Sequence, residues 1–481
     1  MICHPFNSEW GDAIDVLLHI DYSSLEVPFF LKVHHGIGHI KHAVCHRITG
    51  LKIIISFGPL CRFPHDSMIS NQAFRSRLVI IMALRNSWRM AMSQANEKVV
   101  IIGGAVMGSF TAYFLRREGF SGSIQIIEQD SSYSFSSTAL SAASIRTQLA
   151  CPFSIHMSLF AAQICRDPKA WFGSEADIEF RERGYLTLAA PEHADVMYEN
   201  AEMQVANGAD VLKLDKAALA KKYPWINHDD VAHGFFGASS EGWFDAWALL
   251  QCVKRSAKLL GVQYIDGRAV GVRTTGSRVT GVDLADGSTL PCDWCVNAAG
   301  AAGGRVAEWL DIDLPVEARK RTVFHFKSPI ASADFPVILD TSGFWLRPEG
   351  EGFIAGIAPD ADRDPRADGD FEPDHYLLEE KLWPLLAHRI PAMESLKLQR
   401  AWAGHYEMNV FDHNGVVGPH DKYQNFMFAT GFSGHGVMHS PATGRGVAEL
   451  ITHGQFRTID LTALGYARIR NNTPIVETMV Y

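Results

Sequence analysis

Hydrophobic and polar positions along most of the chain follow patterns that predict strands and helices in alternation. Residues 98–102 and 124–128 are short apolar runs that suit buried strands, and the periodicity of residues 106–118 predicts a helix between them. Residues 269–290 alternate apolar and polar around Gly-Ser and Asp-Gly turns, which predicts hairpins. We also expect helices over 153–165, 246–260, 371–393 and 441–452, and strands over 262–266, 294–296, 320–358 and 426–429. This order predicts an α/β domain interrupted by a second, antiparallel domain.

The turn after the first strand carries the sequence Gly103-Gly-Ala-Val-Met-Gly108. Gly103 permits a tight turn, a small residue at position 105 lets a pyrophosphate approach the backbone, and Gly108 lets the helix pack closely. The free N–H groups at the start of that helix favour phosphate binding. Glu128 follows Gly103 by 25 residues, where an acid that binds ribose is expected. The pattern favours dinucleotide binding, although Ala105 replaces its second glycine and an ordinary βαβ unit is the alternative.

The composition narrows the possible partners. The chain has 481 residues and a net charge of −9, which predicts two or more domains and disfavours a nucleic-acid partner or an anionic membrane surface. No apolar run reaches the roughly 18–20 residues of a transmembrane helix, so we expect no transmembrane segment and a cytoplasmic protein. Cys292 and Cys295 form an isolated C-x-x-C pair that favours core thiols over a redox or metal site. We expect no bound metal.

Residues 1–95 differ from the rest of the chain. They hold 8 of the 21 histidines, and their apolar periodicity is poor. We expect an atypical extension that is poorly ordered, or a misassigned start with the natural chain beginning near Met90 or Met92. A targeting segment and a separate module are the alternatives.

Five later segments carry a more specific signal. They are Ser136–Arg146, Gly267–Val270, Val296–Gly300, Gly343–Pro348 and Ala429–Gly444, and the last contains Gly431-Phe-Ser-Gly-His-Gly436. In this order they resemble the DAO-type FAD-dependent oxidoreductases, which include sarcosine oxidases, dimethylglycine oxidases and D-amino-acid dehydrogenases. The resemblance covers roughly residues 98–455, and the glycine-rich hexapeptide is its most specific part.

The resemblance implies a Rossmann-like, discontinuous FAD-binding domain with an inserted antiparallel α+β substrate domain. The expected FAD-binding segments are 96–175, 240–318 and 400–456, the substrate domain is 176–239 and 319–399, and 457–481 is a C-terminal tail. The expected FAD-binding residues are Gly103, Gly104, Ala105, Val106, Met107, Gly108, Glu128, Gln129, Ser137, Thr138, Ser141, Ala142, Ala143, Ser144, Val270, Ala299, Gly300, Gly431, Gly434, His435, Gly436 and Val437.

Two departures from the family pattern refine the expectation. Covalent sarcosine oxidases carry a cysteine where Gly404 stands here, so we expect noncovalent FAD. Those enzymes also carry a lysine that holds the substrate carboxylate where Met438 stands, which argues against sarcosine itself.

The resemblance also implies a reaction. We expect oxidation of the C–N bond of a small amino acid or amine, of the D-amino acid or N-alkyl glycine type, by hydride transfer to flavin N5. Oxygen or a respiratory carrier would accept the electrons. The candidate catalytic residues are Arg347 as a carboxylate clamp, and Arg146, His435 and Tyr406 beside the flavin, with structural ion pairs or packing as their alternatives. A dehydrogenase of a 2-hydroxy acid and a flavin-carrying assembly or binding protein are the alternative functions.

Overall fold

The computed structural model describes Gln94 and residues 96–332, 335–367 and 369–476 in full. The chain divides into two units, Met1–Arg85 and Asn86–Tyr481. In the first unit the backbone of four strands forms an antiparallel sheet in the order β2 (Leu25–His34), β1 (Ala13–Tyr22), β4 (Leu51–Ile55) and β3 (Arg47–Ile48). Apart from these strands and Gln94, residues 1–95 lie outside the described residues, so our expectation for them stays a prediction.

The second unit contains a six-stranded sheet whose strands come from distant parts of the chain. Its order is β12 (Gln263–Asp266), β6 (Ser123–Glu128), β5 (Lys98–Ile102), β16 (Trp294–Asn297), β23 (Phe426–Thr430) and β22 (Val416–Pro419). The strands run parallel except for β22, which is antiparallel to β23. Val99 and Ile101 of β5 join one hydrophobic core, and Val100 and Ile102 join another. The central strand is therefore buried on both faces, as its continuous apolar sequence predicts.

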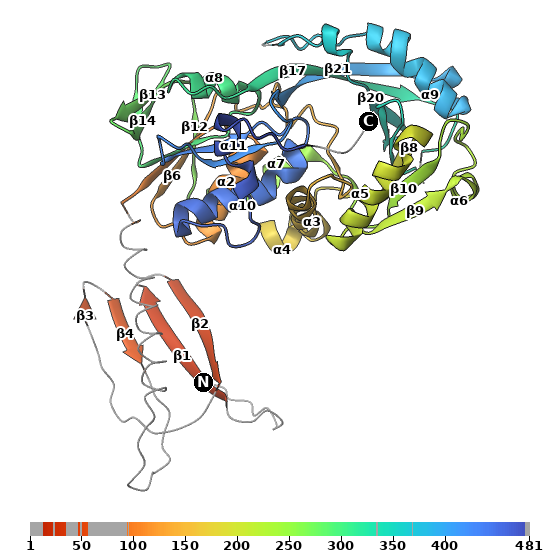
Figure 1. Cartoon of the computed structure of the whole chain (residues 1–481). Helices are drawn as coiled ribbons and strands as arrows, with labels where there is room; N and C mark the ends of the chain where they lie inside the picture. The colour runs from red at the N-terminus through yellow and green to blue at the C-terminus, as the bar shows by residue number, and fades with distance from the viewer. Residues whose placement is uncertain are drawn as a thin grey trace. The chain divides into compact units, whose positions relative to one another are not determined.

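Helices cover one face of this sheet and a small sheet covers the other. On the first face α2 (Val106–Arg117) packs between α7 (Ala246–Leu259) and α10 (Gly436–His453), and α10 also packs on α3 (Pro152–Arg166) (Figure 1). On the second face lie the predicted hairpins, which form β13 (Ala269–Thr275), β14 (Arg278–Leu284) and β15 (Thr289–Pro291). Cys292 and Cys295 are buried free thiols in the core beneath them.

This unit also contains a mixed eight-stranded sheet. Its order is β21 (Lys397–Asn409), β17 (Val316–Lys327), β20 (Gly352–Gly356), β19 (Trp345–Glu349), β18 (Val337–Leu339), β8 (Tyr185–Ala189), β10 (His233–Gly237) and β9 (Val211–Asp215). All neighbouring pairs are antiparallel except β18 and β8. The Rossmann-like sheet and the inserted, largely antiparallel sheet confirm the predicted fold class.

The shorter elements complete the unit. They are β7 (Ser144–Ile145), α4 (Pro168–Phe172), α5 (Ala194–Ala206), α6 (Lys216–Lys222), β11 (Gly242–Trp243), α8 (Gly303–Glu308), the π-helical turn η4 (Leu377–Leu382), α9 (Trp383–Arg389) and α11 (Ala467–Arg470). Within the described residues, no helix is both long and apolar enough to cross a membrane.

Two predicted helices have different limits in the structure. The helix expected over 371–393 begins only at Leu377 and ends at Arg389, because Pro373 precedes it and Pro391 follows it. The last helix begins at Gly436 rather than at Pro441, so that proline lies inside α10. Pro441 has no N–H to donate to the Val437 carbonyl four residues earlier, and the Ser440 hydroxyl donates to it instead, at 2.8 Å.

Candidate active site

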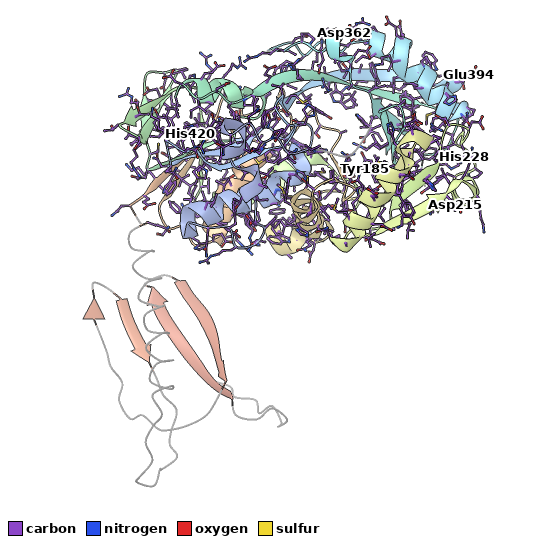
Figure 2. The ribbon with its side chains drawn as sticks, in the orientation of Figure 1. Tyr185, Asp215, His228, Asp362, Glu394 and His420 are labelled. Carbon is purple, nitrogen blue, oxygen red and sulfur yellow. The ribbon has the colours of Figure 1, made fainter. Side chains whose placement is uncertain are left out.

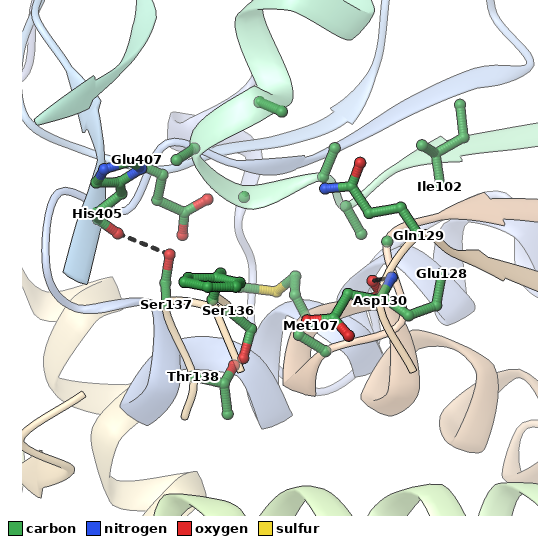
Figure 3. Close-up of a pocket in the computed structure, with 18 of the residues that line it drawn as sticks. Ile102, Met107, Glu128, Gln129, Asp130, Ser136, Ser137, Thr138, His405 and Glu407 are labelled. Carbon is green, nitrogen blue, oxygen red and sulfur yellow. Dashed lines mark hydrogen bonds between the residues drawn. The ribbon is translucent and has the colours of Figure 1, made fainter. Parts of the chain in front are cut away.

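A cavity of about 580 Å³ opens at the carboxyl ends of β5, β6 and β16. Ligands of open α/β sheets bind at this edge, and the volume lies in the usual range of ligand pockets, roughly 300–1,000 Å³. Figure 3 shows Glu128, Gln129 and Asp130 on one side of the cavity, with His405 and Glu407 on the other. Between these two sides, the cavity is lined by Gly103 of the glycine turn after β5 and by Met107 at the start of α2.

The geometry of this turn explains its glycines. Gly103 has φ = +102°, and a Cβ there would lie 2.3 Å from the Ala298 carbonyl oxygen at the end of β16. A Cβ on Gly108 would lie 1.9 Å from the Gly103 carbonyl oxygen, so only glycine lets α2 pack this closely on the turn. Ala105 precedes the first residue of α2 and lines the cavity. An alanine is therefore accommodated at the position of the second glycine.

Glu128, at the end of β6, is fixed at the polar end of the cavity. Its carboxylate accepts hydrogen bonds from the N–H groups of Gly104 at 2.8 Å and Asp130 at 2.9 Å. Burial raises the pKa of Glu128, and these two N–H groups act in the opposite direction. Tyr133 also lines the cavity, and within the described residues its buried hydroxyl has no hydrogen-bond partner. An acid and an unpartnered hydroxyl donor fit the ribose and adenine end of a dinucleotide.

About half of the expected cofactor residues line this cavity. They are Gly103, Ala105, Val106, Met107, Glu128, Gln129, Ser137, Thr138, Ala299, Gly300, Gly436 and Val437. The others do not form its wall, and these are Gly104, Gly108, Ser141, Ala142, Ala143, Ser144, Val270, Gly431, Gly434 and His435. Val270 is 42% exposed, and the preceding residues, Gly267 to Ala269, form the wall in its place. The roles assigned to all these residues stay predictions.

Sequence reasoning did not assign a cofactor role to several other residues of the wall. They include Asp130, Tyr133, Phe135, Arg305, Phe371, His405 and Glu407, whereas Ser136 and Arg268 lie within two segments that carry the family resemblance. Strand alternation was the available signal for two of them, because His405 and Glu407 lie two residues apart in β21 and share a face. Ser137, which lies next to His405 in the wall, donates to the His405 carbonyl oxygen at 2.7 Å (Figure 3). Arg305 reaches the wall from α8, and the remaining residues reach it from loops, which have no sequence periodicity.

Tyr406 points away from the face of β21 that carries His405 and Glu407. Its ring lies against Gly434, where a Cβ would come within 2.5 Å of the ring. The Arg321 guanidinium lies over the same ring, 5.3 Å from its centre, and is itself paired with Asp364 at 2.8 Å. Burial raises the pKa of Tyr406, so its phenol is a neutral hydrogen-bond donor. Gly434 is therefore required for the contact between the glycine-rich loop and Tyr406.

Arg146 and His435 bring together the Ser-rich loop (Ser136–Arg146) and the glycine-rich loop (Gly431–Gly436). The Arg146 Nη2 lies 2.9 Å from the His435 Nε2, and its guanidinium lies 5.7 Å from the ring centre of Tyr185, which begins β8 (Figure 2). Burial, and then the charge of Arg146, hold the pKa of His435 well below its usual range. The same two causes lower the pKa of the neighbouring His439 to about 3. Both imidazoles are therefore neutral at physiological pH.

Glu241 fixes the loop that carries Arg146. This carboxylate is fully buried and accepts hydrogen bonds from the Thr147 N–H at 2.6 Å, the Thr147 hydroxyl at 2.6 Å and the Gln148 side chain at 2.9 Å. The Gln148 side chain also donates to the Tyr185 carbonyl at 3.0 Å. Glu241 thus joins the start of β8 to the residues that directly follow Arg146.

Arg347 is buried in β19, whereas Phe344 and Leu346 point to the opposite side, as the alternation predicts. Its Nε donates to the Ala142 carbonyl at 2.7 Å, and its Nη1 contacts Glu349 at 2.5 Å. Its guanidinium also lies 5.9 Å from the ring centre of Trp243. Within the described residues, its Nη2 makes no hydrogen bond. The observed ion pair and a carboxylate clamp are compatible, because this nitrogen is still available.

Two of the sequence departures have structural counterparts. A Cβ on Gly404 would lie 3.0 Å from the Leu140 Cβ, so this position is packed against the Ser-rich loop. Met438 is buried in the first turn of α10 and brings no charge to the site.

Comparisons with known proteins agree with this geometry. Residues 98–450 match the DAO family, described as FAD dependent oxidoreductase. The chain is 41% identical over 418 residues to FAD-dependent oxidoreductase domain-containing protein 1 of Xenopus laevis, covering 79% of this chain and 84% of the relative. It is 24% identical over 379 residues to the mitochondrial sarcosine dehydrogenase of Mus musculus, covering 75% of this chain and 40% of the relative.

A solved structure has the same fold. L-proline dehydrogenase from P. horikoshii superposes with a TM-score of 0.69 at 23% identity, covering 79% of this chain and 99% of the other. Because the match spans the strand–turn–helix at Gly103, the cavity and α10, the predicted resemblance is confirmed. The chain belongs to the DAO family of FAD dependent oxidoreductases, and FAD is its cofactor.

Proposed function

We propose that the protein oxidises the C–N bond of a small amino acid or amine, of the D-amino acid or N-alkyl glycine type. The observation that carries this proposal is the group formed by Arg146, His435 and Tyr406 at the glycine-rich loop, next to the cavity that fits FAD. L-proline dehydrogenase and sarcosine dehydrogenase, both named for amino acids, support this substrate class.

The arginines would hold the substrate. A planar guanidinium binds a carboxylate with defined geometry, and Arg347 has its Nη2 available for this bond while its other nitrogens fix it to Ala142 and Glu349. Tyr406, whose ring lies against Gly434 of the glycine-rich loop, would donate a hydrogen bond to the substrate from its phenol. These contacts would orient the bond to be broken.

The charges of the site would favour a neutral amine. The Arg146 charge and burial, which together keep His435 neutral, would also disfavour a substrate ammonium group at the same place. His435 has too low a pKa to act as a strong base, so the amine would lose its proton on binding rather than to a catalytic side chain. FAD supplies the chemistry itself by accepting a hydride from the carbon next to nitrogen.

The test is anaerobic mixing of the purified, FAD-loaded protein with panels of amino acids, amines and 2-hydroxy acids. We expect the flavin absorbance to fall with an amino acid or amine. Bleaching by 2-hydroxy acids alone would replace the proposal with a C–O dehydrogenase. If no compound bleaches the flavin, an assembly or binding role replaces catalysis.

Two further parts of the proposal concern how FAD is bound and which molecule accepts its electrons. Because Gly404 offers no thiol, we propose noncovalent binding, so acid precipitation should release all the yellow colour into the supernatant. Yellow colour that remains in the pellet would show a covalent bond. Oxygen consumption during turnover would identify an oxidase, whereas turnover only with a quinone or dye would identify a dehydrogenase. We also propose a cytoplasmic location, which cell fractionation tests.

A further inference from the structure

Glu407 is a buried carboxyl group in the wall of the FAD cavity. It is 8% exposed, and one oxygen accepts hydrogen bonds from the Thr430 hydroxyl and the Gly431 N–H, both at 3.0 Å. Its second oxygen lies against Gly436, where a Cβ would come within 2.7 Å of it. Figure 3 shows the carboxylate pointing into the cavity. Glu407 therefore lies between the glycine-rich loop and the first residue of α10.

This place corresponds to the flavin end of the cavity. The glycine turn at Gly103 and the start of α2 fit the pyrophosphate, and Glu128 lies at the ribose side. His405, Glu407 and Gly436 line the opposite side, so the isoalloxazine is the part of FAD that comes near them. The N-terminus of α10 then stabilises negative charge at that end.

Two negative charges would compete for the same helix terminus. Reduction of FAD by two electrons and one proton leaves the flavin with one negative charge, and a carboxylate close to it is destabilised by repulsion in a buried site. A carboxylic acid in its place would remove the repulsion. We propose that Glu407 takes up one proton when the bound FAD is reduced and releases it when FAD is oxidised again.

Electrons, protons and charge balance in this step. Two electrons and one proton go to the flavin, and a second proton from solvent goes to the Glu407 carboxylate, so the net charge of the site does not change. The reductant is the substrate in turnover and an electrode in the experiment below. The proposal requires only bound FAD, so it does not depend on the substrate class proposed above.

The surroundings of Glu407 suit this role. Burial raises its pKa to about 7, against the hydrogen bonds from Gly431, Thr430 and Phe432, which lower it. The titratable or charged groups on the elements packed around it are His405 and Tyr406 on β21, Lys320 on β17, Arg305 on α8 and His435 before α10. Lys320 is held in ion pairs with Asp370 at 2.8 Å and Asp374 at 2.9 Å. Burial, rather than any of these groups, is the main cause of the raised pKa of Glu407.

The midpoint potential of the FAD-loaded protein, measured by spectroelectrochemistry between pH 5.5 and 8.5, tests the proposal. Below about pH 7 Glu407 is protonated in both states, so the potential should change with pH by one proton per two electrons. Above this pH the slope should double, to two protons per two electrons. Glu407→Gln keeps an oxygen for Thr430 and Gly431 but cannot titrate, so it should show the single slope throughout.

Glu449→Gln is the matched control, because Glu449 is another fully buried glutamate, lies near the end of α10 and does not line the cavity. It should keep the wild-type break in slope. A reduced-minus-oxidised infrared spectrum adds a direct readout on the wild-type protein: reduction should produce the C=O band of a protonated carboxyl, absent in Glu407→Gln. Identical slopes in wild type and Glu407→Gln, or a carboxyl band that persists in the variant, would overturn the proposal.

Discussion

At the scale of single residues, two polar side chains of the site do not use all of their hydrogen-bonding atoms within the described residues. Arg347 uses its Nε and Nη1 for the fold, and the buried Tyr133 hydroxyl has no partner within the described residues. For the Tyr133 hydroxyl, burial without a partner is unfavourable unless a ligand supplies one. These two residues therefore allow tests that separate ligand binding from folding.

The first prediction concerns the proposed carboxylate clamp. Arg347→Lys should raise KM for a carboxylated substrate at least about 10-fold, because hydrogen bonds to charged groups contribute about 1.5–3 kcal/mol and a lysine cannot reproduce the planar contact. Steady-state kinetics measures the effect, with an amine that lacks a carboxylate as the control. FAD content, measured from the ratio of flavin to protein absorbance, should not change. Loss of FAD would assign Arg347 to the fold alone.

The second prediction concerns the adenosine end of the cavity. Tyr133→Phe should raise the Kd for FAD about 2- to 10-fold, since one neutral hydrogen bond contributes about 0.5–1.5 kcal/mol. The free energy of unfolding of the FAD-free protein should not decrease, because no protein group loses a partner and the variant lacks the buried hydroxyl that has none. Titration calorimetry and urea unfolding provide the two measurements. An unchanged Kd would mean that the hydroxyl does not contact the cofactor.

At the scale of elements, one backbone hydrogen bond of α10 is replaced by a side-chain hydrogen bond. Pro441 removes one backbone hydrogen bond from this helix, whose first residues line the cavity, and the Ser440 hydroxyl replaces it at the Val437 carbonyl. Ser440→Ala should therefore destabilise the protein by about 1 kcal/mol. The double variant Ser440→Ala with Pro441→Ala should recover stability, because an alanine at position 441 offers the Val437 carbonyl the N–H that proline lacks. Urea unfolding of the three proteins checks this order, and equal stability of the single and double variants would contradict it.

At the scale of the whole molecule, buried neutral histidines should make the protein sensitive to acid. Burial lowers the pKa of His439 to about 3, so the unfolded chain binds more protons than the folded one between about pH 3 and the usual histidine pKa near 6.5. The stability that His439 contributes is present above about pH 6.5 and is lost as pH falls. The unfolding free energy of wild type should fall with decreasing pH more steeply than that of His439→Asn, by about 1.4 kcal/mol per pH unit. Parallel curves would show that His439 is protonated in the folded protein.

The fold was predictable where local sequence determines local structure. The strand, turn and helix around Gly103 form at the predicted residues, because a buried apolar run, a glycine with positive φ and helical periodicity act over only a few neighbours. The predicted helix from Ala246 is confirmed with Asp245 as its N-cap, which accepts from the Ala248 N–H at 3.0 Å. The start of α10 was misplaced, because a proline usually marks a first turn and the compensating Ser440 bond is a tertiary detail.

The sequence alone determined the family and the cofactor, since these depend on short motifs with fixed spacing, such as Gly103 to Glu128. The tertiary structure decided which residues lie together around the glycine-rich loop. Tyr406 and Glu407 are adjacent in sequence but lie on opposite faces of β21, whereas Arg146 and His435 are 289 residues apart and in contact. Strand alternation divides neighbours between two environments, and sheet topology brings distant loops together. Burial, which no local pattern records, then raises the pKa of Glu407 and lowers that of His435.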